Sequence, residues 1–436
     1  MDATYVGILA VVLMLGLIYV GMHIGIALAL VSFICVAILR SPEVAGRMVA
    51  AAANDSVRED LFSVVPLFVL LGLLVSMSGV GRDTFDVAER FMRRIKAGLG
   101  VATVQANAIF AAITGVSVAS ATIFAKVAVP EMRRHGYSKR FSVGVVAGSS
   151  VLGMLIPPSL LLIIYGVVAE ESVGKLFIAG ILPGLLLAAM FSLMIVALAY
   201  LKPPMIFERV DDAGPGRRDT LLSVMRKALP IAVLITVVLG GLYAGFFNPT
   251  EAAAVGAAVA FIIALLRRSL DGTKIWQVLV ATGHVAVSVL FLIMAVSLYS
   301  RMLALAGLPE NIASTLRDLG LGAEGFLGCY VLVVVLLGCI IDSVSIMLIV
   351  LPIVTPIAES FGFDKIWFGI ITVIAVEVGL LTPPFGISVY TVKASLDDPS
   401  ITVWDVFAGT FPFVLCMLAC LGVIIAVPEI ATVLVR

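Results

Sequence analysis

The chain has few of the residues on which most enzymes and soluble domains depend. Lys, Arg, Asp and Glu together make up only 13% of its 436 residues, and there are three His. Soluble globular domains are roughly 25% charged. The five Cys lie within apolar runs and lack metal-ligand spacing, so they are interpreted as small core residues. The sequence therefore indicates neither a transition-metal centre nor a disulfide framework.

Motifs for catalysis and for nucleic-acid binding are also missing. The formal net charge is zero, so no basic surface for nucleic acid is expected. No Ser/His/Asp set, zinc motif or nucleotide loop of the form Gly-x-x-x-x-Gly-Lys stands out. We therefore predict that the chain is not an enzyme, needs no cofactor and contains no ATPase motor.

Apolar residues dominate what is present. They make up 61% of the chain, and the mean hydropathy is +1.18. Many apolar runs reach about 20 residues, which is the length that crosses a bilayer as a helix. Lipid offers no hydrogen-bond partners, so a spanning segment must satisfy its own backbone, and the alternation typical of a β-barrel is absent. The composition predicts an all-α integral membrane protein.

The two halves of the chain repeat each other. The double proline Pro157-Pro158 recurs as Pro383-Pro384, an offset of 383 − 157 = 226 residues. Several other pairs share this offset, namely Ser117 with Ser343, Gly136 with Gly362, and Gly153 with Gly379. Paired, Pro-interrupted apolar segments in two halves are the best sequence indication of a transporter's binding site.

The repeat predicts a division into two units and a linker. Residues 1–201 form the first repeat, 202–227 the linker and 228–436 the second repeat. Each repeat is expected to contain five membrane spans and one longer apolar segment, at 97–133 and 325–361. Each also has a segment broken by the double proline, at 141–166 and 366–392, and a less apolar stretch predicted to lie at the membrane interface, at 42–58 and 268–282.

Charge predicts how these segments are oriented. The breaks at 81–96 and 131–140 are rich in Lys and Arg, whereas the equivalent stretches 307–324 and 357–366 are not. Short cytoplasmic loops are enriched in basic residues, so the two basic breaks are predicted to be cytoplasmic and the equivalent, less basic stretches external. Equivalent loops then lie on opposite sides of the membrane, which means that the repeat is inverted. Segment 97–133 has basic breaks at both ends, which predicts a re-entrant hairpin that enters and returns on one side. Both termini are then external and the linker is cytoplasmic; Arg40, Arg47 and Arg58 are exceptions on the external side.

Small and hydroxyl residues mark the tip of each predicted hairpin. The first tip contains Gly115, Ser117 and Ser120, and the break at Pro157 leaves nearby carbonyls without helical partners. Hydroxyl and carbonyl oxygens are the hard ligands that Na⁺ requires. A Gly or Ser in a membrane helix more often serves close helix packing. The binding interpretation gains weight because the pattern occurs twice, each time with a Pro-Pro break.

Two acidic residues distinguish the second half. Asp342 lies at the second predicted tip, and Glu377 precedes the second break by 383 − 377 = 6 residues. An ionised side chain at the bilayer centre costs about 2.5–3.5 kcal/mol on insertion scales, so both are functional candidates. A structural hydrogen-bonding role is the alternative for each. For Glu377 the open roles are lining the cavity, carrying a proton and capping a hairpin.

These residues resemble the large membrane subunit of the tripartite ATP-independent periplasmic (TRAP) transporters, the DctM-like permeases. The similarity covers almost the whole chain. The most specific pieces are Pro66-Leu67-Phe68, Gly115-x-Ser117-x-Ala119-Ser120, Gly136-Tyr137, Ile156-Pro157-Pro158-Ser159, Ile181-Leu182-Pro183-Gly184, and Glu377-Val378-Gly379-Leu380-Leu381-Thr382-Pro383-Pro384. Near the start the family has Gly-x-Pro, whereas here Gly21 is followed by Met22 and His23.

The resemblance implies an elevator-type transporter of the ion-transporter superfamily in the bacterial inner membrane. It implies Na⁺-coupled uptake of an organic acid, a DctP-like periplasmic substrate-binding protein and a separate, DctQ-like small membrane subunit. The implied cation ligands are Gly115, Ser117, Ser120, Gly153, Ile156, Pro157, Asp342, Ser343, Ser345, Glu377, Gly379, Thr382 and Pro383. The implied substrate-binding residues are Ser117, Ser159, Ser343 and Thr382. Alternatives are a stand-alone Na⁺/carboxylate symporter of the same superfamily and a channel, and the sequence does not identify the organic acid.

Overall fold

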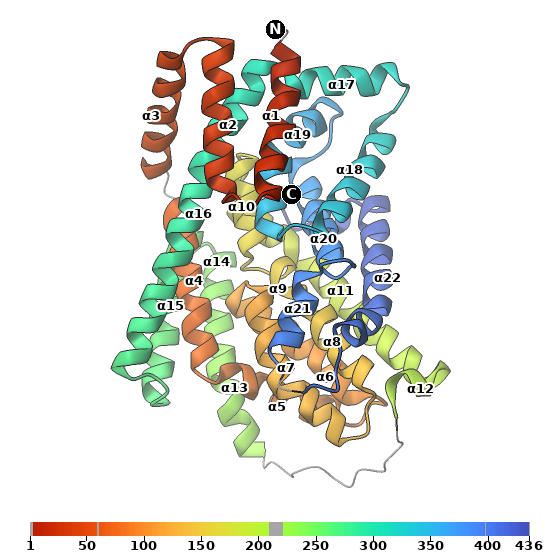
Figure 1. Ribbon diagram of the computed structural model, residues 1–436. Helices are drawn as coiled ribbons and strands as arrows, with labels where there is room; N and C mark the ends of the chain where they lie inside the picture. Colours follow the sequence, from red (N-terminus) through yellow and green to blue (C-terminus); the bar gives the residue numbers. More distant parts are fainter. Residues whose placement is uncertain (1–2, 59–60, 209–220, 397, 436) are drawn as a thin grey trace.

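The protein is built almost entirely of helices (Figure 1). The computed structural model describes residues 3–58, 61–208, 221–396 and 398–435, so the middle of the linker, 209–220, lies outside the described residues. Within these ranges no strand is present beyond one isolated bridge between Tyr137 and Phe207. Six of the described helices are long and apolar enough to cross a membrane, and two bent helix pairs would raise this number to eight. The predicted all-α membrane fold is confirmed.

The first repeat supplies the helices up to the linker. They are α1 (Ala3–Tyr19), α2 (Ile24–Leu39), α3 (Pro42–Arg58), α4 (Leu61–Met77), α5 (Val80–Met92), α6 (Gly98–Thr114), α7 (Ser117–Arg134), α8 (Lys139–Ser150), α9 (Leu152–Leu155), α10 (Leu160–Val168), α11 (Val173–Leu201) and α12 (Pro203–Ile206).

The second repeat follows the same order. Its helices are α13 (Leu221–Ile235), a π-helical turn (Thr236–Gly240), α14 (Gly241–Tyr243), α15 (Pro249–Leu266), α16 (Gly272–Ala306), α17 (Leu308–Asp318), α18 (Ala323–Gly338), α19 (Ser343–Ser360), α20 (Lys365–Leu380), α21 (Ile387–Ala394), α22 (Val403–Ala426) and α23 (Glu429–Thr432).

Both long apolar segments fold back as hairpins. Helices α6 and α7 form hairpin one, and α18 and α19 form hairpin two. Hairpin one enters from the end of the molecule that carries α5, and hairpin two from the end that carries α17 (Figure 1). The segments broken at the double prolines become α8–α10 and α20–α21. The inverted repeat with one re-entrant hairpin in each half is therefore confirmed.

Three stretches differ from the sequence prediction. The breaks 81–96 and 307–324 were expected as polar loops, but most of each forms a helix, α5 and α17. The second interface stretch, 268–282, is not a separate helix, because residues 272–306 form one helix of 35 residues. No proline interrupts that range, and Asp271 caps its start by accepting from the Lys274 amide. The first interface stretch does form a helix of its own, α3.

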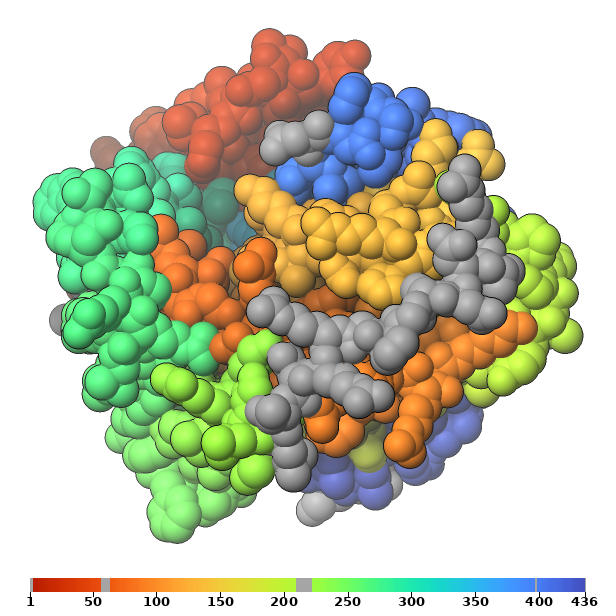
Figure 2. All heavy atoms as spheres, turned by 90° about the horizontal axis from the view of Figure 1, so that it is seen from below, coloured from red at the N-terminus to blue at the C-terminus, as the bar shows by residue number. Residues whose placement is uncertain are grey.

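The helices pack as two groups. The scaffold group contains α1–α4, α13, α15 and α16, and the transport group contains the two hairpins, both broken helices, α11 and α22. The names describe the packing and the proposed role of each group. Helices α5 and α17 lie in the chain between a scaffold helix and a hairpin. Seen from below, green scaffold segments line one side and the orange and yellow segments around hairpin one fill much of the rest (Figure 2).

Helix α5 contacts both groups through different faces. Its buried face, which includes Phe85, packs against hairpin one. Its acidic residues make ion pairs with the scaffold, because Asp83 lies 2.6 Å from Arg267 and Asp86 lies 2.7 Å from Lys227. Helix α5 therefore connects hairpin one to the scaffold group.

The start of the linker is fixed to the base of hairpin one. The Ser138 amide donates to the Ile206 carbonyl at 2.7 Å, and the Glu208 amide donates to the Gly136 carbonyl at 2.9 Å. The Arg133 side chain and the Lys139 amide both donate to the Glu208 carboxylate, which lowers the pKa of Glu208. The first residues of the linker therefore belong to the transport group.

An ion cluster joins the two repeats within the transport group. Asp405, whose side chain is 4% exposed at the start of α22, accepts from Lys139 and Arg140 of α8, each at 3.0 Å. Next to it the backbones of α8 and α22 touch, since a Cβ placed on Gly144 would lie 2.2 Å from the carbonyl of Gly409. The cluster therefore holds the point of closest approach between the two repeats.

We expect Asp405→Asn to lower the free energy of unfolding by about 2 kcal/mol. This is less than the roughly 3–5 kcal/mol of a fully buried pair, because Lys139 and Arg140 are partly exposed. The unfolding midpoint of the purified protein in detergent measures the change. The matched control is Asp271→Asn, which affects an exposed pair with Lys274 at 3.9 Å and should leave the midpoint unchanged. Equal midpoints for the two variants would show that the cluster does not stabilise the fold.

Candidate functional site

The tip of hairpin one lies directly against the first helix break. Gly115 has φ of +64°, and a Cβ on it would lie 2.2 Å from the Pro158 carbonyl oxygen. The Leu160 amide donates to the Gly115 carbonyl at 3.3 Å. On the other side of the tip, a Cβ on Gly153 would lie 3.1 Å from the Ser117 nitrogen. Glycine is needed at position 115, where the two backbones touch and φ is left-handed, and the approach at position 153 is tight.

The other residues predicted for the first site lie around this contact. Ile156 ends α9, and its amide donates to the Leu152 carbonyl at 2.9 Å. Pro157 follows it and is buried, as is Ser117 at the start of α7. The structure thus brings the predicted residues of the first half together at one tip and one break.

A buried amide behind this tip was not predicted. Asn107 of α6 donates to the Ser149 hydroxyl of α8 at 2.7 Å and accepts from the Ser120 hydroxyl of α7 at 2.6 Å. All three side chains are fully buried. Asn107 therefore links the two arms of the hairpin to the broken helix in this conformation. The signal in the sequence was a pair of amides, Gln105 and Asn107, within an apolar segment, which by themselves do not name their partners.

The tip of hairpin two meets the second break in a similar way. A Cβ on Gly379 of α20 would lie 2.5 Å from the Gly338 Cα at the end of α18. The Phe385 amide, just beyond the break, donates to the Cys339 carbonyl at 3.1 Å. The predicted pairing of each tip with its own break is therefore present in both halves of the described chain.

Asp342 caps helix α19. Its carboxylate accepts from the Ser345 amide at 3.1 Å and from the Ser345 hydroxyl. Ser343 begins the same helix and is buried. The hydrogen-bonding role that was the alternative for Asp342 is thus observed, and a carboxylate oxygen that caps a helix can also contact a cation.

The hydroxyls of two predicted substrate ligands are engaged within the protein. The Ser159 hydroxyl donates to the Met154 carbonyl and accepts from the Leu162 amide, which caps α10. The Thr382 hydroxyl donates to the Val378 carbonyl at 2.7 Å. Each hydroxyl thereby satisfies a local backbone group next to a break.

The two breaks differ in exposure. Pro157 and Pro158 are buried, whereas Pro383 and Pro384 are exposed. Apolar side chains near the second break are also exposed, with Phe385 at 56% and Ile340 at 59%. The first site is therefore buried within the described chain, and the second lies at its surface.

Eight helix ends converge where the tips meet the breaks. Helices α6, α9, α18 and α20 end there, and α7, α10, α19 and α21 begin there. Helix α7 packs against α21, and α10 packs against α19. Helix C-termini present carbonyls and partial negative charge, and N-termini present amides and partial positive charge. This arrangement offers oxygen ligands to cations and amide donors to a carboxylate in one place.

Glu377 does not face hairpin two. It lies two residues before Gly379, and two residues correspond to about 200° around a helix. Because Gly379 faces α18, Glu377 lies on nearly the opposite face of α20. It is 1% exposed. The structure therefore separates Glu377 from the other predicted residues of the second site.

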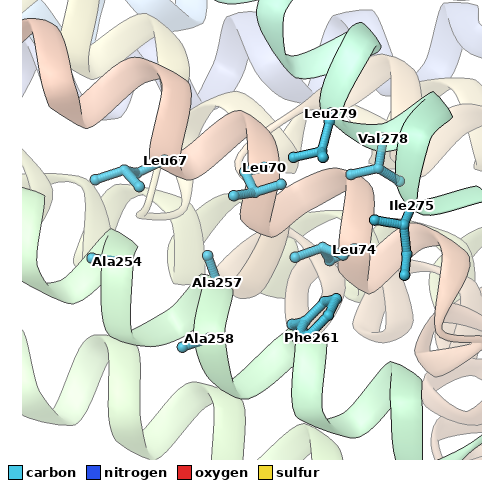
Figure 3. A pocket seen from close by; sticks show the side chains of 10 residues that line it. All are labelled: Leu67, Leu70, Leu74, Ala254, Ala257, Ala258, Phe261, Ile275, Val278 and Leu279. Carbon is cyan, nitrogen blue, oxygen red and sulfur yellow. The ribbon is translucent and has the colours of Figure 1, made fainter. Parts of the chain in front are cut away.

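A separate apolar pocket lies in the scaffold between α4, α15 and α16 (Figure 3). It has a volume of about 280 Å³, and its lining includes Leu67, Phe261 and Leu279. All of its described lining side chains are apolar. Sites for anions need convergent polar groups, and the described lining of this pocket offers none.

The chain resembles known transport proteins along its length. The family described as "Tripartite ATP-independent periplasmic transporter, DctM component" matches residues 11–430. A C4-dicarboxylate TRAP transporter large permease protein of Pseudomonas aeruginosa is 35% identical over 85% of each chain. An ectoine TRAP transporter large permease protein of Halomonas elongata is 31% identical over 84% of each chain.

A solved structure supports the fold alone. The YdaH transporter of Alcanivorax borkumensis superposes with a TM-score of 0.64, covering 84% of this chain and 86% of that one, at 14% identity. The similarity in structure at so low an identity shows a shared helical architecture. It does not carry over a substrate.

We expect Gly115→Ala to lower the free energy of unfolding by more than about 2 kcal/mol, because the new Cβ overlaps the Pro158 carbonyl and the left-handed φ strains alanine. The unfolding midpoint in detergent measures this. Gly328→Ala in α18 is the matched control, since nothing lies within 4 Å of its Cβ position. The midpoint of Gly328→Ala should match or exceed that of the parent, and the midpoint of Gly115→Ala should lie well below it. Equal midpoints for the two variants would contradict the tip contact.

Proposed function

Because the chain belongs to the DctM family of tripartite ATP-independent periplasmic transporters, as a large permease subunit, we propose that it is a secondary active carrier that couples the uptake of an organic acid to Na⁺. The partners in this proposal are a small membrane permease subunit and a periplasmic substrate-binding protein that delivers the acid. The membrane is the bacterial inner membrane.

The convergence of the eight helix ends carries this proposal. The C-terminal ends of α6 and α9 present carbonyls at hairpin one, and those of α18 and α20 do so at hairpin two. Na⁺ is a hard cation, and carbonyl and hydroxyl oxygens can replace its hydration shell. The ligands at the first tip come from around Gly115, Ser117 and Gly153, and those at the second from around Asp342, Ser345 and Gly379. Each tip would then hold one cation.

The N-terminal ends at the same place suit the carboxylate of the substrate. Helix α7 packs against α21, and α10 packs against α19, so each pair joins one helix from each half. Their amides and partial positive charges attract an anion, as do the half-helices of other carriers. A carboxylate bound between two Na⁺ ions would be neutralised in part. Cation and anion would therefore bind better together than alone, which is the basis of coupling.

The substrate is assigned here only as an organic acid. The two relatives described above are named for C4-dicarboxylates and for ectoine, and both compounds carry a carboxylate. The helix N-termini account for this shared group. The remaining selectivity would lie with side chains near the second break and with the substrate-binding protein.

The division into two groups supports an elevator movement. The transport group carries both tips and both breaks, and the scaffold group carries neither. Helices α5 and α17 would serve as the connecting arms, and the ion pairs of Asp83 and Asp86 hold α5 to the scaffold in this conformation. Movement of the transport group would carry the bound ions and acid together across the membrane.

We expect Asp342→Asn to reduce Na⁺-dependent uptake severalfold while the protein still folds. Asparagine caps helices about as well as aspartate, so the variant removes the charge and keeps the cap of α19. Ser117→Ala should also reduce uptake, because it removes a hydroxyl next to the first break. Uptake in proteoliposomes as a function of the Na⁺ gradient, with the small subunit and the binding protein present, measures both.

Ser314→Ala is the control for these variants, since its exposed hydroxyl bonds only within α17. It should transport like the parent. If Asp342→Asn and Ser117→Ala show the parent's uptake and the parent's Na⁺ dependence, the cation sites are not where we place them.

We expect a cysteine at position 93 to react only from the cytoplasm and one at position 318 only from the periplasm. Arg93 and Asp318 are exposed and lie after α5 and at the end of α17, at opposite ends of the molecule (Figure 1). A membrane-impermeant thiol reagent applied to cells and to inverted vesicles tests this. The exposed Cys329 should first be replaced by alanine. Reaction of both positions from the same side would contradict the inverted orientation.

A further inference from the structure

The apolar pocket between α4, α15 and α16, here called the scaffold groove, is open at the surface of the described chain (Figure 3). Two of its lining residues on α15, Ala254 and Ala258, are exposed, and Leu279 of α16 is 51% exposed. The small alanine side chains leave a space that larger side chains of α4 and α16 surround. An exposed apolar surface of this shape is typical of a site that another molecule covers.

The groove has a definite direction. Leu67 and Ala254 lie at one end of it, and Phe261 and Ile275 lie at the other (Figure 3). Phe261 is close to the end of α15, and Ile275 is close to the start of α16. The second end, here called the mouth, therefore opens beside the turn 267–271 that joins these two helices.

The length of the groove matches one leaflet of a membrane. Ala254 lies 266 − 254 = 12 residues before the end of α15 at Leu266, which corresponds to about 18 Å along the helix. One leaflet of hydrocarbon is about 15 Å thick, half of a core of about 30 Å. Trp276, next to the mouth, is 68% exposed, as is typical of an aromatic residue at the edge of the hydrocarbon. The groove thus covers the depth that an acyl chain of one leaflet occupies.

Cationic side chains lie at the mouth. Arg268 of the turn is exposed, and its side chain makes no hydrogen bond or ion pair with any described residue. Lys274 is exposed and directly precedes the lining residue Ile275. Arg267 is already engaged, because it lies 2.6 Å from Asp83 of α5. Arg268 and Lys274 are therefore the two cations available to an anionic group at the mouth.

The acidic residue of the turn does not cancel this charge. Asp271 accepts from the Lys274 amide at 2.8 Å, and its carboxylate lies 3.9 Å from the Lys274 ammonium. Both side chains are exposed, so this ion pair is weak. The ammonium also donates to the Ser269 carbonyl at 2.9 Å, and an ammonium has further hydrogens to donate. Together with Arg268, the mouth keeps a net positive charge.

A phospholipid fits these features better than a protein segment does. A helix with its side chains is about 10–12 Å across. The groove has a volume of about 280 Å³, which is small even for a site that holds one drug-sized molecule. A single flexible acyl chain can enter such a space. Basic residues between transmembrane helices on the cytoplasmic side attract anionic headgroups, and the mouth lies at the same end of the molecule as α5 (Figure 1).

We propose that the scaffold groove binds an anionic phospholipid of the inner leaflet. One acyl chain lies between α4, α15 and α16, and the phosphate contacts Arg268 and Lys274. The lipid contacts both repeats, because α4 belongs to the first repeat and α15 and α16 belong to the second. It therefore stabilises the packing of the scaffold group. This site does not depend on Na⁺ coupling or on the identity of the transported acid.

Native mass spectrometry of the purified full chain tests the proposal, with phosphatidylglycerol as the anionic lipid and phosphatidylcholine as the zwitterionic lipid. The parent should retain one phosphatidylglycerol molecule and bind it severalfold more tightly than phosphatidylcholine. Ala258→Leu fills the groove from its exposed side, so it should lose both lipids. The double variant Arg268→Gln with Lys274→Gln should lose only the preference for phosphatidylglycerol, because its groove is unchanged.

Each variant has a matched control elsewhere on the chain. Ala189→Leu changes an exposed alanine of α11, and Arg93→Gln with Arg94→Gln removes two exposed cations that follow α5. Both controls should bind phosphatidylglycerol like the parent. The unfolding midpoint in detergent is a second measurement, and phosphatidylglycerol should raise it for the parent and not for Ala258→Leu.

Two outcomes would overturn the proposal. If the groove variants and their controls bind phosphatidylglycerol equally, the lipid is bound elsewhere on the chain. If the chain alone binds the lipid in the groove and its complex with the small subunit does not, the small subunit is the occupant of the groove. Neither outcome changes the proposed Na⁺-coupled uptake, which the uptake measurements test separately.

Discussion

The structure depends on one constraint, which is that backbone groups released inside a membrane must find partners within the protein. Each hairpin tip and each helix break leaves amides and carbonyls without helical partners, and lipid supplies none. The protein solves this by placing every tip against its own break. The Gly115 carbonyl accepts from the Leu160 amide, and the Cys339 carbonyl accepts from the Phe385 amide. In our proposal, the ions and the substrate bind to the backbone groups that these contacts leave unsatisfied.

This constraint explains how much of the fold the sequence predicts. The double prolines mark the breaks directly, because proline cannot continue the hydrogen-bond ladder, and the basic residues near Arg93 and Arg133 fix the hairpin that lies between them. The sequence did not predict that α5 and α17 are helices. They are short and amphipathic, and their polar residues resemble those of a loop. The length of α16 escapes for a related reason, since residues 272–282 are polar enough to suggest a separate segment and yet continue into the rest of α16 without a break.

The contacts of the tips with the breaks were predicted in outline, and their details required the structure; ion and substrate binding there stays a prediction. The glycines and prolines at the contacts are explained by a local cause, the close approach of two backbones. They can therefore be recognised from their spacing in the sequence alone. The Asn107 network joins three helices that are distant in sequence, and no local pattern encodes that. The sequence does not show which face of α20 packs against hairpin two. The contact of Gly379 with Gly338 shows it, and with it that Glu377 lies on the other face.

The two halves share a backbone plan and differ in their polar groups. At the offset of 226, the buried Asn107 and Ser120 of the first half correspond to Val333 and Ile346, whereas Asp342 of the second corresponds to Val116. The neutral network lies behind the buried tip, where an ionised group would be costly. The acidic cap lies at the more exposed tip, where the cost of an ionised group is lower. Burial therefore decides which kind of polar group each half can carry, and the same backbone geometry yields two electrostatically different sites.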